Sequence, residues 1–293
     1  MFLIHENQNT YRSILLNHSL NRLHYIKYFH SPEKEWIIFL HGAGGSTATW
    51  KKQVDHFKND FNLLLIDLRD HGKSKNIQPE IKDYSFPMVS DDLLKVMEDA
   101  DVKTAHFITL SFGSILIQDF AMRHPNRIQK MVVVGGVFSG SPLIKGFVFT
   151  AKFLNLFLSY RQMYSLFSYI LMPYRRNQKA RKVYQKHATE LTQKEYLKWV
   201  GLYNEFFNLL KTYHERTSSH KMLILMGGDD YIFLEGARKL AENQLNTELK
   251  ILPRVGHIAN IEAPKTVNSL ALNFLLNQEE KQGTTRLSDT NLL

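Results

Sequence analysis

The sequence predicts an α/β protein in which helices cover a mostly parallel β-sheet. Short apolar, β-rich runs alternate with amphipathic helical patterns along most of the chain. The alternation stops after Val137 and resumes at Lys221, and the interval between them has helical patterns throughout. At 293 residues the chain is long enough for one large core with an insertion.

Eight strands and five helices follow from these patterns, in chain order. The expected strands are Arg12–Leu16, Leu23–Phe29, Trp36–Leu40, Asn62–Asp67, Ala105–Leu110, Lys130–Gly135, Met222–Met226 and Glu248–Leu252. The expected helices lie near Trp50–Phe57, Phe86–Ala100, Ser114–Arg123, Leu234–Asn243 and Pro264–Leu276. A short Asn-rich turn at 17–21 joins the first two strands, which predicts that the sheet opens with an antiparallel hairpin.

The interval 139–219 is rich in aromatic residues and too long for a loop, so we expect an inserted helical cap. The α/β core then comprises residues 1–138 and 220–278. Residues 279–293 are polar without periodicity, and we expect this tail to be disordered.

The composition narrows the class of protein. Hydrophobic residues make up 44% and charged residues 22%, as in an ordinary soluble enzyme. The absence of cysteine excludes disulfides, thiolate catalysis and zinc–cysteine sites. The N-terminus turns polar too early for a secretory signal and no run is long enough to span a membrane, so we expect a cytoplasmic protein. The net charge of +9 is most simply a mildly basic surface, and no nucleic-acid motif accompanies it, so no nucleic-acid partner is expected.

Ser111 lies between an apolar run that ends at Leu110 and an amphipathic stretch that begins at Ile115. A tight strand-to-helix turn there exposes the hydroxyl and places it beside the N–H groups of a helix N-terminus. Such turns usually have glycine two residues before the serine, where this chain has Thr109. A β-branched residue there could shift the turn or narrow the pocket.

Three further segments fit the chemistry of a nucleophilic serine. The strand at 36–40 runs into the glycine-rich loop 42–45, where the N–H of Ala43 could act as an oxyanion donor with that of Phe112. A strand ends in Asp229 and Asp230, and His257 follows the last strand. Because sites in open parallel sheets lie beyond the carboxyl ends of strands, we expect serine, acid and histidine at one edge.

The chain resembles the α/β-hydrolase superfamily, in its serine-nucleophile, esterase/lipase-like branch with a helical cap after the sixth strand. The resemblance runs from about Tyr11 to Leu276. Besides the segments above, it rests on Asp67–Ser74, on His124–Ile128 and on the histidine segment Gly256–Pro264. The order Ser, Asp, His is also that of the family.

The resemblance implies a role for each site residue. Ser111 corresponds to the nucleophile, His257 to the general base and Asp230 to the acid that orients it, with Asp229 as the only rival. The family's alternative acid position is occupied here by Gly135–Val137, which offers no acid. No metal or organic cofactor is implied.

Four polar residues near these segments have structural interpretations. His41 more simply orders the glycine-rich loop than takes part in catalysis, and Arg69 and His71 are structural or at the pocket rim. Asn260 caps a loop or, alternatively, contacts substrate. The basic run 175–182 is a solvated helix face or, alternatively, rests on an anionic membrane surface.

The function these residues favour is hydrolysis of a carboxylic ester or thioester through an acyl-enzyme, with a small hydrophobic acyl or aromatic substrate. A carbon–carbon bond hydrolase or a cofactor-free lyase would use the same triad and remains an alternative. A non-catalytic binding protein that kept the fold is a second alternative. The oligomeric state is left open.

Overall fold

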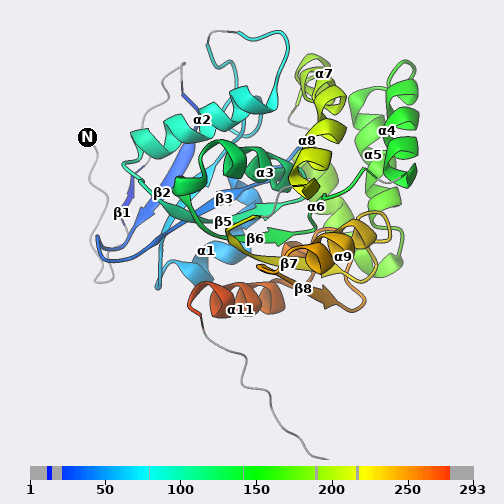
Figure 1. The fold of residues 1–293 in the computed structure, drawn as a ribbon. Helices are drawn as coiled ribbons and strands as arrows, with labels where there is room; N and C mark the ends of the chain where they lie inside the picture. The colour runs from blue at the N-terminus through cyan, green and yellow to red at the C-terminus, as the bar shows by residue number, and fades with distance from the viewer. Residues whose placement is uncertain are drawn as a thin grey trace, which may run out of the picture.

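A single eight-stranded sheet runs through the computed structural model, which describes residues 12–14, 22–78, 80–140, 142–188, 191–215 and 218–277 (Figure 1). Its strands are β1 (Arg12–Ile14), β2 (Tyr25–Phe29), β3 (Trp36–Leu40), β4 (Asn62–Ile66), β5 (Ala105–Leu110), β6 (Ile128–Val134), β7 (Lys221–Gly227) and β8 (Thr247–Leu252). Their order in the sheet is β1-β2-β4-β3-β5-β6-β7-β8. β2 pairs antiparallel with both β1 and β4, and every other pair is parallel. The expected mostly parallel eight-stranded sheet is confirmed.

Helices cover both faces of the sheet. They are α1 (Lys51–Phe57), α2 (Phe86–Asp99), α3 (Gly113–Arg123), α9 (Leu234–Asn243), α10 (Ala259–Glu262) and α11 (Pro264–Leu275). α1 and α11 pack against each other on one face, and α2 and α3 on the opposite face (Figure 1). Because both faces are covered, the central strands are continuous apolar runs, and every residue of β4 and β5 is buried.

Local signals explain where several helices begin. The Oγ of Ser85 accepts a hydrogen bond from the Met88 N–H at 3.4 Å at the start of α2, and a proline occupies its first turn. α11 also has a proline in its first turn. The four-residue helix α10 was not expected, because so short an element has no periodicity to detect.

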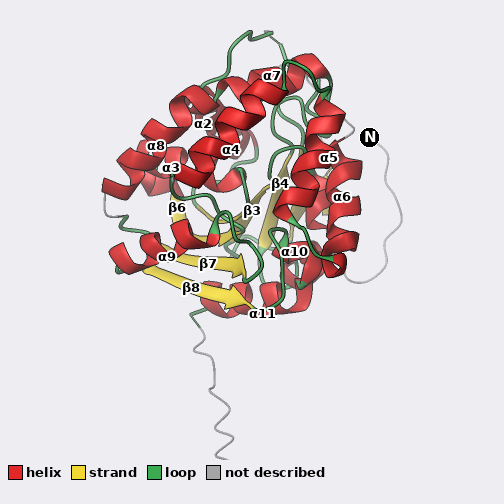
Figure 2. Cartoon of the chain, turned by 90° about the vertical axis from the view of Figure 1, so that its right-hand side faces the viewer, coloured by secondary structure: helices red, strands yellow, loops and turns green. Residues whose placement is uncertain are grey.

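Five helices lie between β6 and β7, at the side of the molecule opposite β1 (Figure 1). They are α4 (Pro142–Leu154), α5 (Tyr160–Leu171), α6 (Gln178–Ala188), α7 (Gln193–Gly201) and α8 (Tyr203–Glu215). α5 and α6 lie side by side, and α8 contacts α3 of the core (Figure 2). The described residues of the interval 139–219 are therefore mostly helical, as expected, while its status as a separate cap domain stays a prediction.

The observed bounds differ from the expected ones by a few residues. β6 begins at Ile128, two residues early, and β2 begins at Tyr25, two residues late. The predicted turn 17–21 and the predicted disordered tail 279–293 lie outside the described residues. None of the described helices is both long enough and apolar enough to cross a bilayer.

Candidate active site

Ser111 occupies a sharp turn between β5 and α3. Its φ of 48° lies in the left-handed region, which a side-chain-bearing residue adopts only under strain. Its N–H donates to the carbonyl oxygen of Val134 at 3.0 Å, and this bond ties the turn to the end of β6. At Gly113 a Cβ would lie 2.7 Å from the carbonyl oxygen of Leu40, so only glycine lets α3 begin this close to β3.

Thr109 does not displace this turn. It is fully buried within β5, where it pairs in register with Leu40 of β3 and Val133 of β6. Its Oγ1 has no hydrogen-bond partner among the described residues. The departure from glycine thus leaves an unsatisfied hydroxyl rather than a shifted elbow.

The structure brings Ser111, His257 and Asp230 into one hydrogen-bonded chain. Oγ of Ser111 lies 2.8 Å from Nε2 of His257, and Nδ1 of His257 lies 2.7 Å from Oδ2 of Asp230. Because a carboxylate only accepts, Nδ1 carries the proton and Nε2 accepts from the serine hydroxyl. His257 and Asp230 are each 1% exposed, so the carboxylate acts on the imidazole with little screening by water.

Close packing explains the glycines around this histidine. Gly135, at a φ of 55°, takes the place of the alternative acid, and a Cβ there would lie 2.3 Å from the His257 carbonyl oxygen. A Cβ on Gly227 would lie 2.2 Å from the Gly256 carbonyl oxygen. The backbone of the histidine loop therefore lies directly against the ends of β6 and β7.

Asp229, the rival acid, is engaged elsewhere. Nε and Nη2 of Arg176 lie 2.8 and 2.6 Å from its Oδ2, so it forms an ion pair with the segment between α5 and α6. The structure thus places only Asp230 of the two acids against His257. Most of the basic run 175–182 is exposed, as expected of a solvated helix face, and two of its arginines also have protein partners. Arg176 pairs with Asp229, and Arg181 donates to the carbonyl oxygens of Met172 and Tyr174.

The glycine-rich loop is held by two buried histidines. His41 donates from Nδ1 to the Gly42 carbonyl oxygen at 2.8 Å and accepts the Leu68 N–H on Nε2 at 3.0 Å. Nε2 of His71 accepts the N–H of Gly44 at 3.0 Å. Burial, together with nearby His41, lowers the pKa of His71 to about 3, so His71 stays neutral and remains an acceptor. The structural interpretation of His41 and His71 is confirmed.

This arrangement leaves the two expected oxyanion donors without a partner. Within the described residues neither the Ala43 N–H nor the Phe112 N–H is used by another protein group, and Ala43 lies at the cavity beside Ser111.

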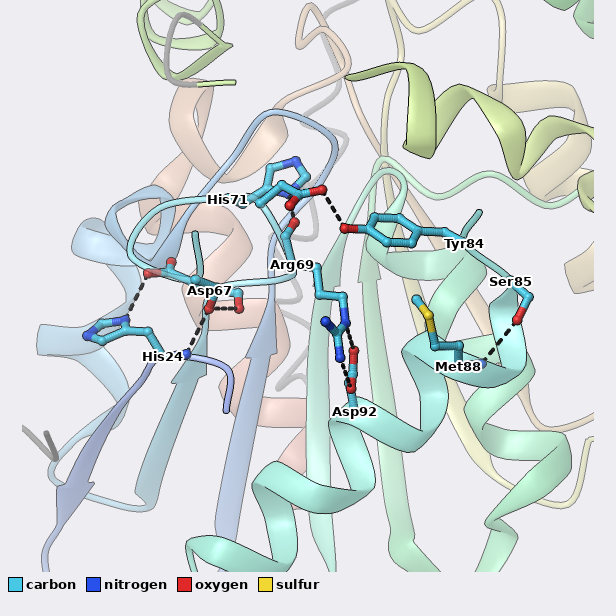
Figure 3. Close-up of polar contacts among 10 residues, drawn as sticks. His24, Asp67, Arg69, His71, Tyr84, Ser85, Met88 and Asp92 are labelled. Atoms are coloured by element: carbon cyan, nitrogen blue, oxygen red, sulfur yellow. Dashed lines mark hydrogen bonds and ion pairs between the residues drawn. The ribbon is translucent and has the colours of Figure 1, made fainter. Parts of the chain in front are cut away.

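A polar network joins the loop at 67–74 to His24, directly before β2, and to α2 through the side chains of Asp67 and Arg69 (Figure 3). Asp67 accepts from the Thr47 N–H at 2.6 Å and from Nδ1 of His24 at 2.8 Å. Burial opposes ionisation of Asp67, but hydrogen bonds led by that of His24 leave its pKa below the ordinary value. Arg69 forms a two-pronged ion pair with Asp92 on α2. Arg69 is thus structural, as expected.

Asn260 also has a structural role. Its Nδ2 donates to the Thr49 backbone carbonyl oxygen at 3.3 Å, and its backbone carbonyl oxygen accepts from Nε2 of Gln53 at 3.1 Å. The side chain is fully buried and joins the loop after His257 to the start of α1. Its place in the loop, not a substrate contact, is what the structure supports.

Residues of the helical insertion line the site, and they were not identified from the sequence. Val183 and Tyr184 of α6 line the cavity that holds Ser111 and His257, which measures about 50 Å³. Tyr164 of α5 packs so closely on the glycine-rich loop that a Cβ on Gly44 would lie 2.7 Å from its ring. Larger hollows of about 310 and 680 Å³ contain neither Ser111 nor His257. The density of aromatic residues was the only sequence signal for these contacts.

A second contact from the insertion supports the histidine loop. Nδ2 of fully buried Asn177 donates to Oε2 of Glu262 at 2.6 Å, and the same oxygen accepts the Gly256 N–H at 3.1 Å. Burial raises the pKa of Glu262 despite these bonds. The residue before His257 is therefore fixed by the segment that also holds Asp229.

Comparisons with known proteins agree with this architecture. A family model described as "alpha/beta hydrolase fold" matches residues 35–151. Human protein ABHD8 is 24% identical over 248 residues, which cover 83% of this chain but 56% of ABHD8, so the chain spans about half the length of that relative. A 2-hydroxy-6-oxononadienedioate/2-hydroxy-6-oxononatrienedioate hydrolase from a Pseudomonas species is 26% identical over 264 residues, or 82% of this chain and 88% of that protein.

A solved structure shows the same fold. The enol-lactonase of Burkholderia xenovorans LB400 superposes with a TM-score of 0.72 at 20% identity, over 87% of this chain and 96% of that one. The family match covers β3 to α4, which include the glycine-rich loop and the Ser111 turn. Taken with the sheet order and the inserted helices, these matches show that the chain has the α/β-hydrolase fold.

Proposed function

We propose that this chain is a serine hydrolase that cleaves carboxylic ester or thioester bonds through an acyl-enzyme on Ser111. The observation that carries the proposal is the hydrogen-bonded chain from Ser111 through His257 to Asp230. A serine whose hydroxyl already donates to a neutral imidazole, itself oriented by a buried carboxylate, is arranged for nucleophilic attack.

The chemistry follows from this arrangement. As Oγ of Ser111 attacks the ester carbonyl, Nε2 of His257 takes the hydroxyl proton. The negative charge that develops on the carbonyl oxygen is received by the N–H groups of Ala43 and Phe112. His257 then passes its proton to the leaving alcohol or thiol, and water repeats the sequence on the acyl-enzyme. Asp230 stabilises the imidazolium at both stages without taking a proton.

The cavity favours a short hydrophobic acyl group. Its side-chain walls are mostly apolar and include Leu110, Ile258 and Ile261. A volume of about 50 Å³ accepts roughly three or four water-sized groups, enough for a few carbon atoms. Tyr184 closes the cavity from the insertion side, which also suits a flat aromatic substrate.

The alternative is hydrolysis of a carbon–carbon bond with the same triad. It is supported by the 26% identity to the Pseudomonas hydrolase, whose name describes an oxo-dienedioate substrate. A panel of acyl esters of rising chain length, set beside a β-diketone, separates the two: preferential turnover of the diketone would favour the alternative.

The direct test is intact-mass analysis after treatment with a fluorophosphonate. We expect one adduct on the wild-type protein and none on Ser111→Ala, with both proteins folded by circular dichroism. His257→Ala is expected to lose both labelling and turnover. A folded wild-type protein that forms no adduct would refute the proposal and favour a non-catalytic binding protein.

A further inference from the structure

The basic charge of the protein is concentrated in one part of the chain. Residues 139–189 contain nine Lys and Arg residues and no Asp or Glu. The remaining 28 Lys and Arg residues equal the 28 Asp and Glu residues in number, so this stretch accounts for the whole net charge of +9. The stretch holds α4, α5 and α6.

The same stretch has four exposed Phe and Leu side chains where α4 meets α5, while Tyr169 and Tyr174 are exposed elsewhere in it. We call these four the aromatic corner: Phe149 is 75% exposed, Phe153 55%, Leu156 75% and Phe157 72%. Phe149 and Phe153 are four residues apart and share one face of α4. The rings of Phe153 and Phe157 are 5.4 Å apart, so the cluster is continuous past the end of the helix.

The aromatic corner is not an exposed piece of core. The opposite face of α4 already packs inward through Ile144, Val148 and Ala151, all of them buried. α4 therefore has two apolar faces, of which only one is used within the molecule. A second apolar face indicates a partner outside the chain.

Cations flank this face. Lys145 and Lys152 are exposed on α4, one turn before Phe149 and Leu156 respectively, and Arg161 is exposed in the first turn of α5. On α4, Lys145 is four residues before Phe149 and Lys152 is three residues after it, so both border the aromatic corner; Nζ of Lys145 also lies 5.9 Å from the centre of the Phe207 ring on α8. Long basic side chains around exposed Phe and Leu suit a surface that is apolar inside and negatively charged at its rim. A second copy of this chain would bring the same excess of basic residues against itself, which disfavours self-association through this face.

We propose that the aromatic corner docks on an anionic lipid bilayer, with its four apolar side chains inserted at headgroup depth and the flanking cations against the lipid phosphates. The membrane contact inferred from the sequence is thereby moved from the run 175–182, where Arg176 and Arg181 have intramolecular partners, to the junction of α4 and α5. The proposal is independent of the proposed catalytic function.

The test is co-flotation of the full chain with phosphatidylcholine vesicles that contain or lack phosphatidylserine. We expect binding to the anionic vesicles only, and a loss of binding as salt is raised. Phe149→Ser/Phe157→Ser removes apolar contact, and Lys145→Glu/Lys152→Glu reverses charge. Each double variant should bind at least about tenfold more weakly.

The matched control is Leu197→Ser/Leu245→Ser, which removes two exposed leucines outside the aromatic corner. It should bind as the wild type does, and circular dichroism should show all variants folded. Absence of wild-type binding to anionic vesicles at low salt would overturn the proposal. So would equal binding by all variants, or a stronger effect of the same substitutions on binding to a single-stranded oligonucleotide than to vesicles.

Discussion

Arg176 lies 2.6 Å from the carboxylate of Asp229, the residue directly before Asp230, whose own carboxylate contacts His257. Two consecutive aspartates therefore serve different segments. Asp229 connects β7 to the helical insertion, and Asp230 connects it to His257. The division of roles makes the two residues a natural pair for mutagenesis.

Asp230→Asn should lower kcat about 10⁴-fold. The amide can favour the wrong tautomer of His257, and it carries no negative charge to stabilise the imidazolium. Asp229→Asn should change kcat only a few-fold, because its side chain does not contact His257. Steady-state hydrolysis of a short acyl ester measures both. Equal losses in the two variants would mean that the acid has been wrongly assigned.

Thr109→Val should raise the free energy of unfolding by about 1 kcal/mol. The hydroxyl of Thr109 is fully buried and has no partner in the part of the chain that the structure describes, and valine has nearly the same shape without that polar group. Urea unfolding measures the change, and fluorophosphonate labelling should stay at the wild-type level. A clear destabilisation would show that the hydroxyl has a partner, such as an ordered water.

Gly113→Ala should destabilise the protein by about 1–3 kcal/mol and slow labelling of Ser111. The new Cβ would lie 2.7 and 2.9 Å from the carbonyl oxygens of Leu40 and His41, and backbone atoms in the core cannot move away cheaply. Gly146→Ala is the control, since its Cβ meets nothing within 4 Å in the middle of α4. That variant should gain about 0.5–1 kcal/mol. Similar effects at both sites would contradict the packing argument.

His71 should make the protein acid-sensitive. Its pKa is lowered to about 3 in the folded state, chiefly by burial, whereas the unfolded chain protonates it near 6.5. Its contribution to stability is therefore complete above about pH 6.5 and is lost at about 1.4 kcal/mol per pH unit as the pH falls toward 3.

In His71→Gln the amide oxygen can still accept the Gly44 N–H, but the titration is gone. Between pH 6 and pH 4, unfolding of this variant should take up about one proton fewer than unfolding of the wild type, so its free energy of unfolding should depend less steeply on pH. Urea titrations at several pH values give this slope, and an unchanged slope would rule out His71 as the titrating group.

Tyr184→Ala should shift ester preference toward longer acyl chains. The ring lines a cavity of only about 50 Å³, and its removal opens the cavity toward the insertion. kcat/KM should rise for longer esters relative to the acetyl ester, while Tyr184→Phe should keep the wild-type preference. A uniform loss across the series would instead indicate a general disturbance of the site.

The sequence was sufficient to predict the eight strands and the meeting of Ser111, His257 and an acid at the end of β7, while the choice of Asp230 over Asp229 came from the family resemblance. Strand periodicity is local, and parallel strands carry their terminal residues to the same edge whatever the loops do. The role of His41 in ordering the glycine-rich loop could also be predicted, because His41 directly precedes that loop in the sequence.

The contacts of the insertion could not be predicted in this way. Tyr164 on Gly44, Tyr184 over the cavity and Arg176 on Asp229 join segments far apart in the chain. A helical pattern shows which face is apolar but not which distant loop that face meets. For the same reason the basic run 175–182 was described as solvated, although two of its arginines have protein partners.

The link from Arg176 and Asn177 to Asp229 and Glu262 makes the insertion less interchangeable than its position in the chain suggests. A foreign set of helices grafted between β6 and β7 would leave both carboxylates without these partners, next to the residues that hold His257. An exchange of the insertion that keeps function would therefore have to exchange Asp229 and Glu262 together with the helices. The segment that can be recombined as a unit thus includes residues of the core as well as the insertion.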